Sequence, residues 1–386
     1  MPITAAEEPW WRSPTAMPWY SSSYAAAATM TSSSSSMSLC LSQPPCASSS
    51  TSADDDLRDL RARFPWMVYP PSFTATSVLR GLTFEPADSG NDVIVATFVK
   101  SGTTWTTYLL HLIRAIAAGT TLEQADAFDD IQQVVVELTW AYDCGQDPHN
   151  WIQPFEKIAR IFKSHLSPSF ATELHGDKAK YVFVLRDPLD VLCSEFNFFQ
   201  PKVSNAPWIK HLATVDDFAK SDHWNDHAWF FNNGNVYEYH RQAWELRDLP
   251  NVMLVCFEDL KEDLPREVAR LAQFMGVADR IDADACHKIA DVASHAAMRS
   301  KREKFDEHWM SQQQVELGRF GPHGPNETAE KVTTNGTTGA GKRALSPEVA
   351  AAVQRAWSET VGLSSYEEMR SKIGVLAALR EGYFVH

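Results

Sequence analysis

The chain of 386 residues has little of what marks a disulfide-bonded or zinc-binding protein. Its six cysteines include no pair at C-x-x-C spacing, and none stands at zinc-ligand spacing with a histidine. In a chain of this length such a pattern indicates free thiols in a reducing compartment. The six are Cys40, Cys46, Cys144, Cys193, Cys256 and Cys286.

Long apolar runs and an excess of basic residues are also absent. The most apolar stretch, 108–118, contains His111 and Arg114 and is far shorter than the roughly 20 residues that a membrane span needs. The N-terminus has no basic segment followed by an apolar core, which argues against a secretory signal. With 49 acidic residues against 35 Lys and Arg, the chain lacks the charge of a general nucleic-acid binder. We therefore expect a cytoplasmic protein with no membrane or nucleic-acid partner, and any small anionic ligand would need a local cluster of cations.

Residues 1–53 differ in composition from the rest of the chain. They are rich in Ser, Ala, Thr and Pro, which provide too little apolar surface to offset the entropy of ordering, so we expect this segment to be disordered. A plastid or mitochondrial transit peptide is the alternative. Such peptides are rich in Arg and poor in acids, whereas Arg12 is the one basic residue here and Glu7 and Glu8 come early. We take 54–386 as one folded domain.

Apolar runs alternate with helical periodicity in the folded part. Val93–Val99 (VIVATFV) is almost wholly apolar and β-branched, which is typical of a strand buried on both faces, and Trp105–Ala118 has helical periodicity. The other expected elements are strands over 159–166, 181–185 and 252–257 and helices that begin at Pro188, Pro265 and Pro347. This order predicts an α/β fold, a single domain with a central parallel sheet flanked by helices. Ligands of such sheets bind beyond the carboxyl ends of the strands.

A polar turn, Lys100-Ser101-Gly102-Thr103-Thr104-Trp105, lies between the first strand and its helix. Unpaired N–H groups at a helix N-terminus attract anions, glycine allows close approach of the backbone, and Lys and hydroxyl side chains add donors. We predict a P-loop-like phosphate-binding loop. It is not the Walker form, because its Lys precedes the Gly and no upstream Gly is present. An ordinary polar turn is the alternative.

Further candidates follow other strands. Arg186 ends one strand, and Ser194 stands seven residues beyond Asp187, about two helical turns along the same face. Arg can hold a phosphate bidentately. Lys163 and His165 are two residues apart in a strand and share a face, and a neutral imidazole can take a proton from an acceptor. Taken alone, these pairs also fit a structural ion pair or a solvated pair.

Glu258 and Asp259 follow the strand that ends at Phe257. An acid in this place holds magnesium in nucleotide hydrolases, which leaves a P-loop kinase or NTPase as an alternative function. We favour the capping of local turns, because the loop at Lys100 is not a Walker loop.

Together these segments resemble the cytosolic-type sulfotransferase family that uses 3′-phosphoadenosine 5′-phosphosulfate (PAPS). The similarity extends from about Phe64 to Tyr366. It is carried by ATFVKSGTTW, FKSHL, KYVFVLRDPLDVLCSEFNFF and VMLVCFEDLKEDLPREVARLAQFMG. The resemblance implies a transferase that moves a sulfonate group from PAPS, as co-substrate, to a hydroxyl or amine of a small-molecule acceptor without a metal. A homodimer is left open.

The resemblance also implies a role for each matched residue. His165 would be the general base, Lys163 would steady the sulfonate and Lys100 would favour departure of the phosphate. The implied donor-binding residues are Lys100, Ser101, Gly102, Thr103 and Thr104 for the 5′-phosphosulfate, Trp105 and Phe257 for adenine, and Arg186 and Ser194 for the 3′-phosphate.

Three departures from the family pattern concern donor binding. Ala293-Ser294-His295 precede Met298, where the family normally has Thr-Ser-Phe before a Met. Phe257 stands where the family usually has Tyr, and the late loop 334–342 keeps its glycines but lacks the family's Arg-Lys pair. Lys331, Lys342 or Arg343 are candidates to replace that pair. The altered loop keeps a non-catalytic protein that binds PAPS or its product PAP (3′-phosphoadenosine 5′-phosphate) as an alternative.

Aromatic residues are the candidates for an acceptor pocket, with a place in the core as the alternative for most of them. They are Trp140, Trp151, Phe155, Phe196, Phe198, Trp208, Trp224 and Trp229.

Overall fold

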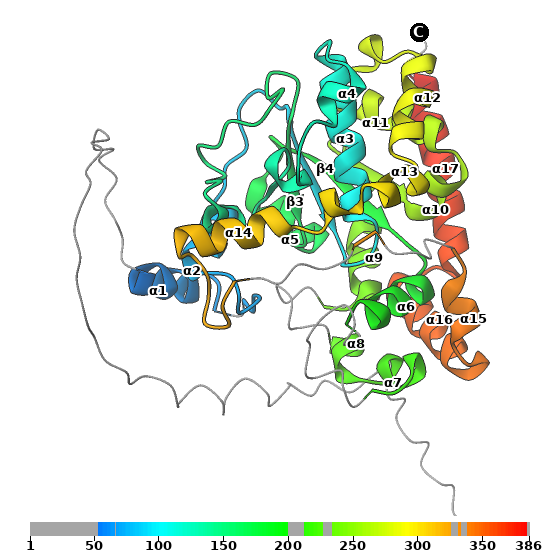
Figure 1. The fold of residues 1–386 in the computed structure, drawn as a ribbon. Helices are drawn as coiled ribbons and strands as arrows, with labels where there is room; N and C mark the ends of the chain where they lie inside the picture. The colour runs from blue at the N-terminus through cyan, green and yellow to red at the C-terminus, as the bar shows by residue number, and fades with distance from the viewer. Residues whose placement is uncertain are drawn as a thin grey trace, which may run out of the picture.

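A computed structural model describes residues 53–65, 67–199, 212–226, 234–325, 331–332 and 338–383 (Figure 1). Residues 1–52 of the segment predicted to be disordered lie outside the described residues, as do Trp208, Trp229 and positions 334–337 of the late loop. In the part of the chain that is described, no helix is both long enough and apolar enough to cross a bilayer.

Within the described residues, five parallel strands form a sheet in the order β2-β3-β1-β4-β5. They are β1 (Asp92–Thr97), β2 (Val136–Glu137), β3 (Arg160–Ser164), β4 (Lys180–Leu185) and β5 (Val252–Cys256). In the middle of the sheet Val95 pairs with Lys163 on one side and Val182 on the other. The predicted α/β fold with a central parallel sheet is confirmed.

Helices surround the strands in Figure 1. Those of the N-terminal half are α1 (Ala53–Arg63), α2 (Ala75–Leu82), α3 (Thr103–Ala117), α4 (Leu122–Ala125), α5 (Pro168–His175) and α6 (Pro188–Phe199). Those of the middle are α7 (Val215–Ala219), α8 (Asp222–Asp226), α9 (Val236–Glu245), α10 (Phe257–Glu262), α11 (Leu264–Met275) and α12 (Ala283–Val292). The last are α13 (His295–Ser300), α14 (His308–Leu317), α15 (Ala340–Ala344), α16 (Pro347–Val361) and α17 (Tyr366–Tyr383).

Two hydrophobic cores cover the two faces of the sheet. Successive residues of a strand point to opposite faces. Val93 and Val95 accordingly join the core that contains α3, α11 and α12. Ile94 and Ala96 join the core that contains α2, α9 and α16. Burial on both faces explains why β1 is a continuous apolar run in the sequence.

Strand ends differ by one or two residues from the sequence prediction. β1 ends at Thr97 rather than Val99, because the chain turns at Phe98, whose carbonyl oxygen accepts a hydrogen bond from Ser101 N–H at 3.3 Å. β3 ends at Ser164, so His165 lies just beyond the strand. Phe257, expected to end β5, is the first residue of α10. β2 was not expected, since two residues show no periodicity.

The carboxyl ends of the parallel strands meet at one edge of the sheet. Thr97, Ser164 and Leu185 end three adjacent strands, β1, β3 and β4. The predicted phosphate loop follows β1. Lys163 and His165 lie at the end of β3, and Arg186 follows β4. The topology therefore brings the three sets of candidates to the same edge, as expected for an open α/β sheet.

Candidate active site

The loop between β1 and α3 turns at two residues with left-handed backbone. Lys100 has φ of 63° and Gly102 has φ of 114°. A Cβ on Gly102 would lie 2.9 Å from the ring of Phe257, so this position requires glycine. The turn leads into α3 at Thr103, where the N–H groups of the first helical turn are available to a ligand. This backbone shape fits the predicted anion-binding loop.

Ser101 lies inside this loop with its side chain fully buried. Its Oγ has no hydrogen-bond partner among the described residues. Next to it, the hydroxyls of Thr103 and Thr97 are hydrogen-bonded to each other. A buried hydroxyl without a partner costs free energy until a ligand satisfies it. Ser101 is therefore suited to hold a ligand oxygen inside the loop.

Arg186, directly after β4, joins its own loop to the phosphate loop. It donates a hydrogen bond from Nη1 to the carbonyl oxygen of Lys100 at 2.9 Å. Its guanidinium lies 4.4 Å from the ring centroid of Phe257, and its buried Nε has no partner among the described residues. The guanidinium is thus fixed through Nη1 while Nε still lacks an acceptor, and this arrangement fits an anionic ligand. Ser194 lies half-buried on α6, which follows Arg186.

The ammonium group of Lys100 lies 4.0 Å from the ring centroid of Phe198 on α6. Burial, together with the charges of Lys331 and Arg186, lowers the pKa of Lys100 to about 7, although Glu195 and Glu307 offset part of this effect. Several cations thus crowd one place without enough negative charge. An anion bound there would relieve this repulsion and restore the charge of Lys100.

Trp105 and Phe257 form an aromatic wall beside the loop. Their rings meet edge to face, with centroids 5.5 Å apart. The indole N–H of Trp105 donates to the carbonyl oxygen of Ala293 at 2.8 Å, which fixes the ring. Paired aromatic rings beside an anion-binding loop fit a nucleobase, which is the ligand group predicted for Trp105 and Phe257.

His165 is oriented by the end of β1. Its Nδ1 lies 3.1 Å from the carbonyl oxygen of Thr97. Because a carbonyl only accepts, we assign the proton of the neutral ring to Nδ1, which leaves Nε2 as the basic nitrogen. Burial lowers the pKa of His165 to about 3, and the charge of Lys163 contributes to the lowering. The imidazole is therefore neutral at physiological pH and can accept a proton.

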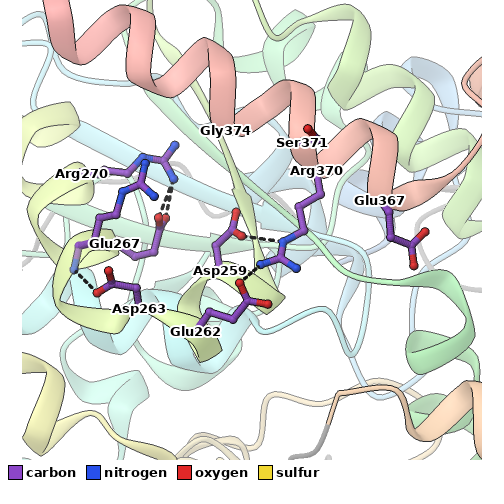
Figure 2. A pocket seen from close by; sticks show the side chains of 10 residues that line it. Asp259, Glu262, Asp263, Glu267, Arg270, Glu367, Arg370, Ser371 and Gly374 are labelled. Atoms are coloured by element: carbon purple, nitrogen blue, oxygen red, sulfur yellow. Dashed lines mark hydrogen bonds and ion pairs between the residues drawn. The ribbon is translucent and has the colours of Figure 1, made fainter.

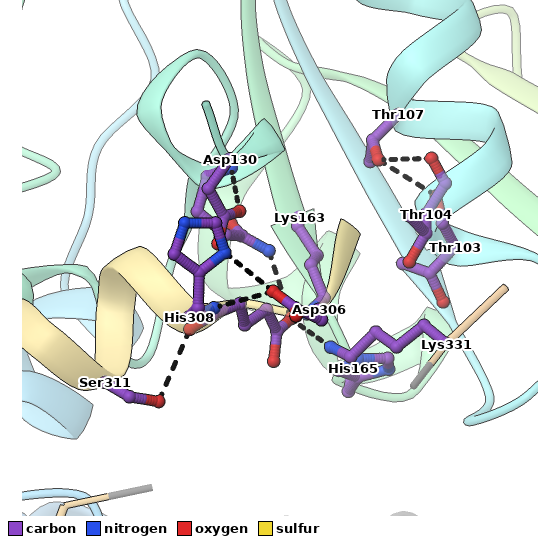
Figure 3. A network of polar contacts seen from close by, with 12 residues as sticks. Thr103, Thr104, Thr107, Asp130, Lys163, His165, Asp306, His308, Ser311 and Lys331 are labelled. Atoms are coloured by element: carbon purple, nitrogen blue, oxygen red, sulfur yellow. Dashed lines mark hydrogen bonds and ion pairs between the residues drawn. The ribbon is translucent and has the colours of Figure 1, made fainter. Parts of the chain in front are cut away.

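Lys163 contacts an acid that comes from far along the chain. Its Nζ lies 2.7 Å from Oε1 of Glu307, and Lys331 forms an ion pair with the same oxygen. All three side chains are largely buried. Figure 3 shows Lys163, Lys331 and His165 close together at the end of β3. The charges of Lys163 and Lys331 outweigh burial and hold the pKa of the Glu307 carboxyl well below its usual range.

No sequence motif indicates that Glu307 is a site residue. It precedes α14, and 144 positions separate it from Lys163. The signal that marks it is structural: Glu307 has φ of 65°, a strained value for a residue with a side chain. Such strain tends to persist where function over-determines the backbone.

The three substitutes considered for the late loop lie apart. Lys331 pairs with Glu307 beside the histidine. Lys342 lies 2.7 Å from Glu367 and 3.7 Å from Asp187, at the start of α6. Arg343 lies on α15. Lys331 therefore belongs to the His165 end of the site, whereas Lys342 lies closer to Arg186.

Asp190, in the first turn of α6, holds the late loop. Its two carboxylate oxygens accept hydrogen bonds from the N–H groups of Gly339 and Gly341, each at 2.7 Å. The start of α6 is capped by Asp187, whose side chain accepts from Leu189 N–H at 2.9 Å. The late loop is thus attached to the helix that follows Arg186.

The acids after β5 are engaged in packing contacts. Glu258 accepts from Asp187 N–H at 3.1 Å and from the hydroxyl of Tyr366 at 2.6 Å. Asp259 accepts from Arg370 Nε at 2.6 Å. Glu258 and Asp259 are therefore structural acids, but they bind segments far along the chain instead of capping local turns as expected.

The aromatic residues proposed for an acceptor pocket divide into two groups. Trp140 and Trp224 are buried, and Trp224 donates its indole N–H to Tyr237, so both belong to the core. Phe198 lies under the Lys100 ammonium and faces the site.

One cluster has the composition of a metal site but is an ion-pair cluster. Ligand atoms of Asp130, Asp306 and His308 lie within 4.8 Å of one another. Nδ1 of His308 lies 2.7 Å from Asp306, and its Nε2 lies 3.0 Å from Asp129. Burial opposes the charge, but hydrogen bonds to Asp129 and Asp306 outweigh it and raise the pKa of His308 to about 9. Both ring nitrogens therefore carry protons at neutral pH.

A hollow lies between α10, α11 and α17 (Figure 2). Its charged groups satisfy one another: Arg370 binds Asp259 and Glu262, and Arg270 lies 2.7 Å from Glu267. Arg370 thereby connects α17 to α10, and the hollow is lined by more acids than arginines.

Comparisons with known proteins identify the family of the chain. The family model described as "Sulfotransferase domain" matches residues 90–365. The chain is 26% identical over 219 residues to sulfotransferase 2A1 of Macaca fascicularis, which covers 55% of this chain and 69% of that protein. It is 29% identical over 199 residues to cytosolic sulfotransferase 6 of Arabidopsis thaliana, which covers 50% of this chain and 57% of that protein.

Solved structures share the fold. Retinol dehydratase in complex with androsterone and inactive cofactor PAP has a TM-score of 0.52 and 18% identity, covering 80% of this chain and 94% of that chain. A mouse sulfotransferase complexed with PAP has a TM-score of 0.51 and 14% identity, covering 81% of this chain and 98% of that chain.

Proposed function

Because the chain belongs to the sulfotransferase family, whose chemistry is sulfonate transfer, we propose that its donor is PAPS and its acceptor a hydroxyl or amine of a small molecule. The observation that carries the proposal is the junction of two loops by Arg186 and Lys100, with an imidazole at the end of the neighbouring strand.

The residues at this junction fit a doubly anionic nucleotide. Ser101 Oγ and Arg186 Nε are buried donors that lack a partner among the described residues. Gly102 leaves no room for a side chain, and Lys100 carries less charge than it would with an anion beside it. In the proposal Lys100 and residues 101–104 hold the 5′-phosphosulfate, and Arg186 and Ser194 hold the 3′-phosphate. Trp105 and Phe257 face the adenine.

When bound, the donor supplies a sulfonate group on a phosphate leaving group. His165 takes the proton of the acceptor's O–H or N–H on Nε2 as the acceptor atom bonds to sulfur. The bond between sulfur and the bridging oxygen breaks, and its electron pair stays on the phosphate of PAP. Lys100 stabilises the charge that develops on this phosphate, and Lys163 stabilises the sulfonate oxygens.

The donor's own charge adjusts the base. Burial and Lys163 hold the pKa of His165 at about 3, where the ring is a weak base. A bound anion favours the imidazolium, so it raises this pKa toward neutrality. Proton transfer to His165 is thereby favoured when donor is present.

The comparisons support a small acceptor. One structural neighbour is complexed with androsterone, and retinol dehydratase has also been solved with retinol and PAP. A relative that is 28% identical over 190 residues is named amine sulfotransferase. These bound molecules and this name are consistent with a hydroxyl or amine acceptor for this chain. The cytoplasmic location and the homodimer stay predictions.

Two measurements test the proposal. Calorimetry of the full chain with PAP should show binding, which Lys100→Ala weakens. Labelled PAPS incubated with the protein and a cell extract should give a sulfonated product, identified by mass analysis. Turnover of ATP with magnesium in place of PAPS would indicate a kinase or NTPase. Binding of PAP with no product from any acceptor would indicate a non-catalytic binding protein.

A further inference from the structure

Lys331 is a cation that the proposed mechanism leaves without a role. It comes from the C-terminal part of the chain, and its side chain is 18% exposed. It contacts Glu307, which also contacts Lys163, and it lies beside His165 in Figure 3. Its charge acts on both Lys100 and His165. Lys331 therefore lies at the reaction end of the site.

Cations outnumber acids among the described groups in direct contact at this end. Glu307 is the ionised acid that contacts both Lys163 and Lys331. Glu137 and Asp130 also act on Lys163 through space, but burial raises the pKa of Glu137 to about 7, so it offsets only part of the excess positive charge. Unbalanced buried charge is costly, and an anionic ligand removes that cost.

Glu307 is built to hold the two lysines. Its side chain is 8% exposed, and Gln132 donates a further hydrogen bond to it at 3.1 Å. Glu307 has a left-handed backbone immediately before α14, and its carboxylate contacts Lys163 of β3. With both lysines bound to Oε1, their ammonium groups lie close together.

We infer that Lys331 binds the sulfonate group of the donor together with Lys163, and that Glu307 is the residue that positions both. This inference rests on the proposed function. Sulfonate oxygens carry negative charge throughout an in-line transfer, and a pre-positioned cation stabilises it without reorganisation. Lys331 contacts Glu307, the same acid that Lys163 contacts. We therefore assign Lys331 to the sulfonate, as for Lys163, and not to the 3′-phosphate that is assigned to Arg186.

The test compares PAPS with PAP, which lacks the sulfonate, in the absence of acceptor. Lys331→Met should weaken PAPS binding about tenfold or more in calorimetry and change PAP binding less than twofold, since a charged hydrogen bond is lost only with PAPS. Lys331→Arg should restore most of the PAPS affinity. Equal affinities of Lys331→Met and the unaltered protein for PAPS would overturn the inference, as would an equal loss for both nucleotides.

Lys301→Met is the matched control. Lys301 is 17% exposed and lies 2.8 Å from Asp126, so it is as buried and as well paired as Lys331. It contacts Tyr108 rather than the site histidine. This variant should bind PAPS and PAP as the unaltered protein does.

A double variant separates sulfonate binding from neutralisation of Glu307. If Lys331 only balances Glu307, then Glu307→Gln with Lys331→Met should bind PAPS as well as Glu307→Gln alone. We expect the double variant to bind PAPS about tenfold more weakly than Glu307→Gln, with equal PAP affinity. Thermal unfolding checks that each variant is folded. Failure of the proposed function can be told apart from failure of this inference, because in the former case the unaltered protein binds neither PAPS nor PAP.

Discussion

The Nδ1–H of His165 donates to the carbonyl oxygen of Thr97, the last residue of β1, at 3.1 Å. This contact fixes the imidazole from the strand that leads into the phosphate loop. The same strand therefore positions both the base and the loop. A displacement of the end of β1 would move both.

His165→Ala should lower the turnover rate by about 10²- to 10⁴-fold, because the acceptor proton then has no base. PAP affinity should stay within twofold, since the ring is not expected to contact the nucleotide. Labelled PAPS with the acceptor found in extract gives the rate, and calorimetry gives the affinity. Unchanged turnover would remove His165 as the base.

The donor affinity should fall as the pH rises above 7. Burial and neighbouring cations lower the pKa of Lys100 to about 7, so the free protein loses this ammonium charge above that pH. Binding of PAP at pH 8 should then take up a proton, because the anion restores the charge. Calorimetry in buffers of different ionisation enthalpy measures this uptake. Lys100→Arg, which stays charged, should show neither the uptake nor the decline; equal uptake in both proteins would contradict this assignment.

Gly102→Ala should disrupt the phosphate loop. The position has φ of 114°, and an added Cβ would lie 2.9 Å from the Phe257 ring. We expect a loss of about 1–3 kcal/mol in the free energy of unfolding and at least about tenfold in PAP affinity. Gly119→Ala is the control, because φ is 84° there and no atom lies within 4 Å of the added Cβ. Equal PAP affinity of the two variants would show that the Phe257 contact is unimportant.

His308 should stabilise the fold in acid and not in base. Hydrogen bonds to Asp129 and Asp306 outweigh burial and raise the pKa of His308 to about 9, above about 6.5 in the unfolded chain. The contribution is fully present below pH 6.5 and is lost as the pH rises through 9. His308→Gln should lower the free energy of unfolding by about 1–2 kcal/mol at pH 6, after allowance for solvent screening.

Urea unfolding at pH 6 and pH 9.5 checks this prediction. The difference between His308→Gln and the unaltered protein should shrink at the higher pH. His287→Gln, at an exposed position of α12, should have no effect at either pH. A pH-independent loss for His308→Gln would show that packing, not charge, accounts for the effect.

The framework of the fold could be predicted because its signals are local. The apolar run at 93–99 marks a doubly buried strand, and Gly102 and Asp187 mark the turns that follow β1 and β4. Their place at one sheet edge follows from parallel topology alone. This is enough to bring Lys100, His165 and Arg186 together.

The remainder of the site depends on contacts that leave no local trace. Glu307 and Lys331 reach Lys163 from 144 and 168 positions away, and their own neighbours in sequence show no motif. Asp190 fits a helix cap by spacing, yet its carboxylate binds two backbone N–H groups about 150 positions later. Such pairings are fixed by packing, so no periodicity or spacing predicts them.

The attachment of the late loop to Asp190 has a consequence for variation. Asp190 binds main-chain N–H groups, which every residue except proline provides. The contact itself therefore requires no particular side chain at either position. The backbone does require glycine, because Gly339 has φ of 74° and an added Cβ on Gly341 would lie 2.2 Å from the carbonyl oxygen of Leu189. A substitution at either glycine should therefore loosen the anchor although no side-chain contact is lost.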